Sequence, residues 1–84
     1  MAKRQHVGSE NQVGQNIVQI RQSKGIRQSM LLARVQVRGA DISQHALSAI
    51  EGQKRPVTDR ELRAIADALG VPAEELLSPE RPEG

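Results

Sequence analysis

The side chains best suited to chemistry lie between residues 43 and 55. Four of them carry uncharged hydrogen-bonding groups and two cations follow: Ser43, Gln44, His45, Ser48, then Lys54 and Arg55. At 100° per residue, Gln44, His45 and Ser48 fall within about 100° of one another on a helix. Base edges bind neutral hydrogen-bonding groups, whereas phosphates bind positive charge. The pattern therefore indicates a helix that lies in a DNA major groove, with Gln44, His45 and Ser48 at the bases.

Other chemistry fits these residues less well. The chain shows no nucleophile–base–acid set and no Gly-rich phosphate loop after a strand, so an enzyme is not expected. Ser43 and Ser48 lack the Asp-Ser-Leu setting of acyl carriers. His45 has only His6 as a second histidine and the chain has no cysteine. We therefore expect neither a metal nor a cofactor.

The composition points to one small domain. The chain has 84 residues and no aromatic side chain, so its core must come from Leu, Ile, Val and Ala, with Met30 as a further candidate. The lack of cysteine fits a reducing compartment. No apolar run approaches the roughly 20 residues of a membrane span, and the start lacks the hydrophobic stretch of a signal peptide. These features predict a cytoplasmic protein.

Charge is divided unevenly along the chain. Residues 1–56 hold nine Lys and Arg against three Asp and Glu, whereas residues 57–84 hold three against seven. Such polarity suggests that one end of the domain meets a polyanion. The acidic second half, with the last two predicted helices, would suit a protein partner.

Periodicity predicts an all-α fold. Val13, Ile17 and Ile20 form one apolar stripe, Thr58 and Glu61 form a capping box, and residues 62–69 carry a second stripe. Glycines follow most of the stripes. Five helices are expected over 12–24, 28–38, 44–51, 58–69 and 71–77. Residues 1–11 and 79–84 are polar and are expected to be a disordered arm and a disordered tail, which leaves 12–78 as the folded domain.

The order and spacing of these residues resemble one known family. The marks are Val13-Gly14, Ile17, Ile20-Arg21, Gly25-Ile26, Gln28, Leu31, Ile42-Ser43, Leu47, Ile50-Glu51, Val57-Thr58-Asp59, Glu61-Leu62, Ala68-Leu69-Gly70-Val71 and Leu76-Leu77. Together they resemble the lambda-repressor-like, Cro- and Xre-type helix-turn-helix family. The resemblance implies a compact five-helix domain that binds double-stranded DNA. The third helix enters the major groove, usually as a homodimer on a near-palindromic operator. The implied role is transcriptional regulation, most often repression.

The resemblance also assigns roles to single residues. Gln28 matches a glutamine that contacts phosphate and braces the start of the third helix, and Arg21 matches a residue that pairs with Glu51. Ser43 is expected to cap the third helix and donate to phosphate. Lys54 and Arg55 follow that helix as phosphate clamps.

Two positions depart from the family pattern. Arg27 replaces a threonine that usually caps the second helix, and a nearby phosphate would offset its unfavourable charge there. Residues 39–42 lengthen the turn before the third helix. An alternative remains open, in which the same fold serves as an antitoxin or a protein-interaction module. Salt-insensitive binding, or no binding to any duplex, would favour that alternative.

Overall fold

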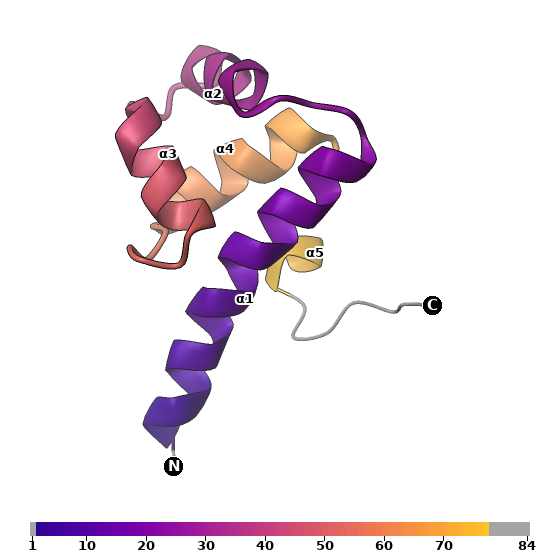
Figure 1. Ribbon diagram of the computed structural model, residues 1–84. Coiled ribbons are helices and arrows are strands. Elements are labelled where there is room, and N and C mark those ends of the chain that lie inside the picture. The colour runs from indigo at the N-terminus through magenta and orange to yellow at the C-terminus, as the bar shows by residue number, and fades with distance from the viewer. Residues whose placement is uncertain (1, 78–84) are drawn as a thin grey trace.

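The computed structural model describes residues 2–77, which form five α-helices and no strand (Figure 1). Side chains are described from Val13 onward. The helices are α1 (Ala2–Ser23), α2 (Gln28–Val37), α3 (Gln44–Glu51), α4 (Asp59–Leu69) and α5 (Ala73–Leu77). The predicted all-α, five-helix class is confirmed. The expected tail, 79–84, lies outside the described residues.

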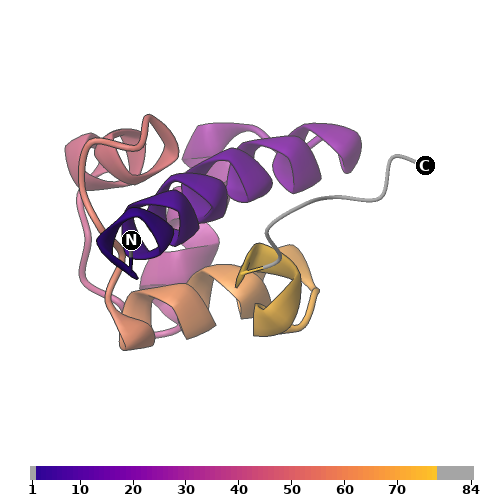
Figure 2. The same cartoon turned by 90° about the horizontal axis from the view of Figure 1, so that it is seen from below.

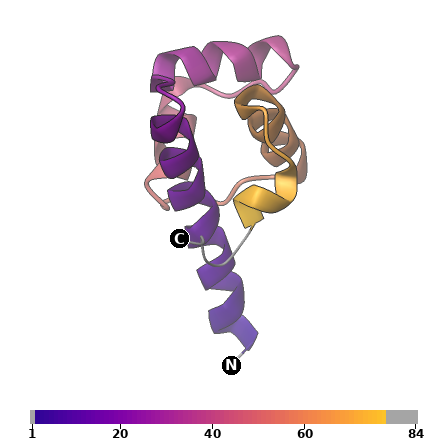
Figure 3. The same ribbon diagram turned by 90° about the vertical axis from the view of Figure 1, so that its right-hand side faces the viewer.

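The first helix is longer than the periodicity predicted. Its backbone is helical from Ala2 rather than from about residue 12, and it ends at Ser23. The N-terminal part of α1 extends beyond the other four helices (Figures 1 and 3). Over residues 2–11 this backbone differs from the disordered arm that was expected for 1–11, and residue 1 lies outside the described residues. The segment contains no proline, and adding a residue to an existing helix costs far less than nucleating a new one.

Glycines end the helices largely as predicted. Gly25, Gly39 and Gly70 all have positive φ angles, from 69° to 92°. The predicted stop at Gly52 differs, since its φ is −85° and the next residue, Gln53, takes the left-handed conformation at 67°. The backbone N–H of Lys54 then donates to the Ala49 carbonyl at 2.8 Å, which closes the last turn of α3.

The core is aliphatic and draws on all five helices. Its largest fully buried apolar side chains are Ile17, Leu31, Val35, Leu47, Ile50, Ile65 and Leu76. Viewed from below, α1 runs between α3 on one side and α4 with α5 on the other (Figure 2). Met30 does not join this core, because 44% of its surface is exposed. It lies on the outer side of α2, opposite Leu31 and Val35.

The crossing of α1 and α3 depends on Gly14. A Cβ atom built on Gly14 would lie 2.3 Å from the carbonyl oxygen of Ile50 and 3.1 Å from that of Glu51. Both atoms belong to the backbone of α3, so they cannot rotate away. Because Gly14 has no side chain, the two helices can approach closely. The C-terminal end of α3 therefore packs directly against α1.

Local contacts fix the last two helices. The capping box predicted for α4 is present, because Thr58 Oγ1 accepts from the Glu61 N–H and Glu61 accepts from the Thr58 N–H. The last helix begins at Ala73, after Pro72, rather than at residue 71 as expected. Asn16, which is buried, donates from Nδ2 to the Leu76 carbonyl at 2.9 Å and so ties α5 to α1. No helix among residues 2–77 is long and apolar enough to span a bilayer.

Candidate nucleic-acid interface

The third helix has one buried side and one polar exposed side, as its sequence predicted. Leu47 and Ile50 are 0% and 2% exposed and seat the helix on the core. Gln44, His45 and Ser48 are all exposed on the other side. This helix therefore presents uncharged hydrogen-bonding groups to solvent from a fixed aliphatic base.

Ser43 starts this helix as predicted. Its backbone is extended, and its Oγ accepts a hydrogen bond from the Ala46 N–H at 3.0 Å. Ile42, which precedes it, is buried and joins the same core cluster as Leu47. A polar cap and an apolar residue before it together define where α3 begins. Ser43 itself remains exposed.

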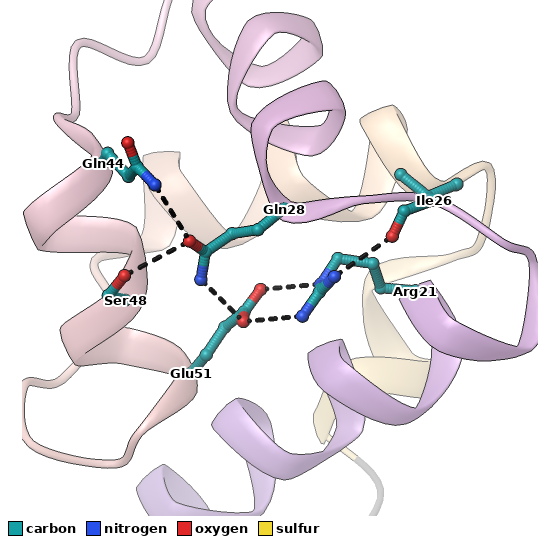
Figure 4. A network of polar contacts seen from close by, with 6 residues as sticks. All are labelled: Arg21, Ile26, Gln28, Gln44, Ser48 and Glu51. Carbon is teal, nitrogen blue, oxygen red and sulfur yellow. Dashed lines mark hydrogen bonds and ion pairs between the residues drawn. The ribbon is translucent and has the colours of Figure 1, made fainter.

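A largely buried ion pair holds the other end of α3. Arg21 of α1 donates from Nε and Nη2 to the two carboxylate oxygens of Glu51 at 3.0 and 3.1 Å (Figure 4). The side chains are 13% and 6% exposed. Arg21 also donates from Nη1 to the Ile26 carbonyl at 3.1 Å. The predicted pairing is confirmed, and it compensates the negative charge that Glu51 places at a helix C-terminus.

Gln28 connects this ion pair to the exposed side of α3. Its Nε2 donates to Glu51 Oε1 at 3.0 Å. Its Oε1 accepts from Gln44 Nε2 at 3.4 Å and from Ser48 Oγ at 3.3 Å (Figure 4). A single amide therefore contacts both the buried carboxylate and two of the three exposed polar side chains. Gln28 thereby links the start of α2 to α3, as the family resemblance implied.

The two sides of this network differ in strength. The contacts to Glu51 are charge-assisted and have ordinary lengths, whereas the contacts from Gln44 and Ser48 lie beyond the usual hydrogen-bond range. Gln44 and Ser48 therefore lose little by exchanging Gln28 for a new partner. The arrangement holds their side chains near one another while leaving their hydrogen-bonding capacity available.

Cations lie at both ends of this surface. Arg27, at the start of α2, and Lys54, just after α3, are exposed and have no carboxylate partner among the described residues. Arg27 adopts the N-cap conformation of α2 without a side-chain cap. The missing cap that the sequence suggested is thus confirmed. The free N–H groups of that first turn and the guanidinium both favour an anion nearby.

Arg55, expected to be a phosphate clamp, forms an ion pair within the protein. Its Nη1 and Nη2 donate to the two carboxylate oxygens of Glu61, each at 3.0 Å, and Nη1 also donates to the Pro56 carbonyl. The bidentate bond raises the pKa of Arg55 and lowers the pKa of Glu61 below its ordinary value of 4.5, although burial opposes both shifts. Arg55 thus joins the loop to α4. Spacing could not reveal this pair, because Glu61 had already been assigned to the capping box.

The acidic second half is also less acidic than its composition suggested. Asp67 pairs with Arg38 at 2.6 Å, Glu61 pairs with Arg55 at 3.0 Å, and Asp59 lies 3.7 Å from Arg63. Arginines thus neutralise all three acidic residues of α4. The two other acidic residues in the described part of this half, Glu74 and Glu75, lie on α5.

Two polar residues that sequence reasoning missed also support this region. Gln36, on α2, donates to the Ile42 carbonyl, and the Gln53 side chain lies over Gly14. Neither has a sequence signal, since both appear as exposed helix or loop glutamines. No group of three or more His, Asp or Glu side chains among the described residues could hold a metal ion.

The comparison with protein families agrees with this geometry. The sequence model of the Cro/C1-type HTH DNA-binding domain matches residues 16–82, which is most of the chain. The chain therefore belongs to the Cro/C1-type helix-turn-helix family of DNA-binding domains. No curated protein and no solved structure matches it. In this family the helix-turn-helix unit corresponds to α2 and α3.

Proposed function

We propose that this protein binds double-stranded DNA sequence-specifically and regulates transcription, with α3 in the major groove. The observation that carries the proposal is the exposed set Gln44, His45 and Ser48, supported from below by Gln28 and the Arg21–Glu51 pair. Glutamine can bind adenine through two hydrogen bonds, and serine can donate or accept. Preorganised neutral groups of this kind discriminate among base edges.

The phosphates would be held by the cations around α3. Arg27 and the N–H groups of the first α2 turn are suited to one strand, and Lys54 is suited to the other side of the groove. Ser43 adds a hydroxyl donor. Each such contact fixes the register of α3 without reading sequence. Arg55 is left out of the proposal, because its guanidinium is held by Glu61.

Repression by occlusion of a promoter is the simplest mode of action for such a domain. One α3 of eight residues covers only a short stretch of groove. We therefore propose that two copies bind a near-palindromic operator, with half-sites about one helical turn apart. A homodimer on DNA would double the number of base contacts and so provide the specificity that one copy lacks.

Selection of duplexes from a random pool, followed by salt titration of the selected site, tests the proposal. If Arg27 and Lys54 each contact one phosphate, log Kobs should fall against log salt with a slope of about −2 for each protomer. A palindromic consensus would support the dimer. If no duplex is enriched, or if binding ignores salt, a protein-binding role through α5 becomes the better explanation.

Two substitutions and one control substitution assign the contacts. Lys54→Ala should reduce the salt slope by about one unit on every duplex. Arg60→Ala removes another exposed cation, which lies on α4, and should leave the slope unchanged. Gln44→Ala should cost roughly 1–3 kcal/mol of discrimination at one base pair, with little change on random DNA. An equal loss on selected and random duplexes would show that Gln44 does not read a base.

A further inference from the structure

The connection between α2 and α3 is held in an unusual way. It spans residues 38–43 and is longer than the tight turn of the family pattern. Its second residue, Gly39, has a positive φ angle of 92°. The N–H of Gly39 donates to the Gln36 carbonyl and the N–H of Ala40 donates to the Val35 carbonyl, at 3.0 and 3.3 Å. These two hydrogen bonds close α2 and direct the chain away from the helix axis.

Two buried side chains then fix the path of the chain. Ala40 is 1% exposed and Ile42 is 5% exposed, whereas Asp41 between them faces solvent. Ile42 is the last residue before the cap of α3. The position of its peptide group therefore decides where Ser43 lies and in which direction α3 starts.

One side chain fixes that peptide group. Gln36 Nε2 donates to the Ile42 carbonyl oxygen at 3.0 Å. Among the described residues, no other side chain of α2 is recorded with a hydrogen bond to the backbone of residues 38–43. A lengthened turn has more conformations to choose from than a tight one. This bond selects the one in which α3 meets Gln28.

The two ends of α3 are held differently. Its C-terminal end is fixed by the close contact with Gly14 and by the Arg21–Glu51 pair. Its N-terminal end, which carries Gln44 and His45, is held by the apolar Ile42, by Gln36 and by the long bond from Gln44 to Gln28. Loss of the Gln36 bond would therefore let the N-terminal end swing about the fixed C-terminal end.

We propose that Gln36 is a positioning residue for DNA sequence discrimination, although it contacts no base. The inference rests on the proposed function of α3. Eight helical residues extend about 12 Å, so a rotation of about 10° moves the free end by about 2 Å. Hydrogen bonds to base edges tolerate only a few tenths of an ångström. A small change in the direction of α3 thus removes the contacts of Gln44 and His45.

The test compares Gln36→Ala with Gln19→Ala. Gln19 is an exposed glutamine of α1 whose side chain makes no hydrogen bond to another described residue, and it controls for loss of an amide from a helix surface. The affinity ratio between the selected duplex and a random duplex is measured for each variant and for the wild type, together with thermal unfolding. Gln36→Glu is a second variant, because a carboxylate of similar length cannot donate to the Ile42 carbonyl.

We expect Gln36→Ala and Gln36→Glu to lower the affinity ratio about fivefold or more. Random-duplex affinity should stay unchanged in Gln36→Ala, and Gln19→Ala should change neither affinity. Amide NMR shifts should change at residues 42–45 and not at 49–51. An unchanged ratio, or an equal loss on both duplexes, would overturn the inference while leaving the proposed function intact. A wild-type protein that does not distinguish the two duplexes would overturn both.

Discussion

Glu51→Gln tests most directly how α3 is held on the domain. Glutamine keeps the volume of the side chain and removes its charge. Glu51 accepts three hydrogen bonds, two from Arg21 and one from Gln28, at 3.0 to 3.1 Å. An amide has one oxygen and two N–H donors. At least one N–H of Arg21 or Gln28 would therefore face another donor in a poorly exposed site.

The size of the effect follows from the burial of the pair. Removing one member of a buried ion pair costs about 3–5 kcal/mol, because the remaining charge loses its partner. Arg21 keeps its bond to the Ile26 carbonyl and is 13% exposed, which places the loss near the lower end. A loss of about 3 kcal/mol corresponds to roughly 12–24 °C in melting temperature for a domain of this size.

Urea unfolding followed by far-ultraviolet circular dichroism measures this loss. Intrinsic fluorescence is unsuitable because the chain has no aromatic residue. Glu74→Gln serves as the control, since Glu74 is an exposed carboxylate that forms no ion pair with another described residue. It should change the free energy of unfolding by no more than about 0.5 kcal/mol. The same samples report helix content, which should not change in the folded state.

The double substitution Arg21→Met with Glu51→Leu completes the test. Replacing both charges with apolar groups leaves no uncompensated charge. The double variant should therefore lose less stability than the sum of the losses in Arg21→Met alone and in Glu51→Leu alone. The reasoning about this pair is refuted if Glu51→Gln unfolds within about 0.5 kcal/mol of the wild type. It is also refuted if the stability loss in the double variant equals the sum of the losses in the two single variants.

Three further substitutions test the positions of single groups by the same unfolding measurement. Gly14→Ala should destabilise the protein by about 1–3 kcal/mol, because its Cβ would overlap the Ile50 carbonyl; an unchanged stability would mean that α1 and α3 are farther apart. Gln53→Gly should stabilise it by up to about 1 kcal/mol by relieving a left-handed backbone, and a loss would show that the Gln53 side chain matters more. The pKa of Glu61 is lower in the folded than in the unfolded protein, so its stabilising contribution is complete above about pH 4.5 and is lost as the pH falls through the folded value. The stability difference between wild type and Glu61→Gln should therefore shrink below that pH, and a constant difference would contradict the pairing with Arg55.

Features that depend on nearby residues could be predicted from the sequence. The caps at Ser43 and Thr58, the helix ends at Gly25, Gly39 and Gly70, and the polar side of α3 all follow from residues within a few positions of one another. Helical periodicity fixes these relations before any tertiary contact forms. The Arg21–Glu51 pair was predictable for two other reasons, the unfavourable position of Glu51 on its helix and the family resemblance.

The extent of α1 was harder to predict. Residues 2–11 carry no apolar stripe and no proline, so the pattern does not say where a helix that begins to propagate will stop. Met30 shows a related limit. A methionine within a helix suits a core or a surface equally, and only the packing of α2 against α4 turns Leu31 and Val35 inward and leaves Met30 in solvent.

The particular hydrogen-bond partners of Gln28 and Gln36 were decided by tertiary structure. A glutamine can donate or accept in any direction, so the sequence cannot show that Gln28 joins Glu51 to Gln44 and Ser48, or that Gln36 holds Ile42. An arginine such as Arg55 likewise pairs with whichever carboxylate the fold brings near. The local sequence thus determined which groups α3 exposes. The packing of distant segments decided how firmly, and in which direction, those groups are held, because long polar side chains take their partners from the fold.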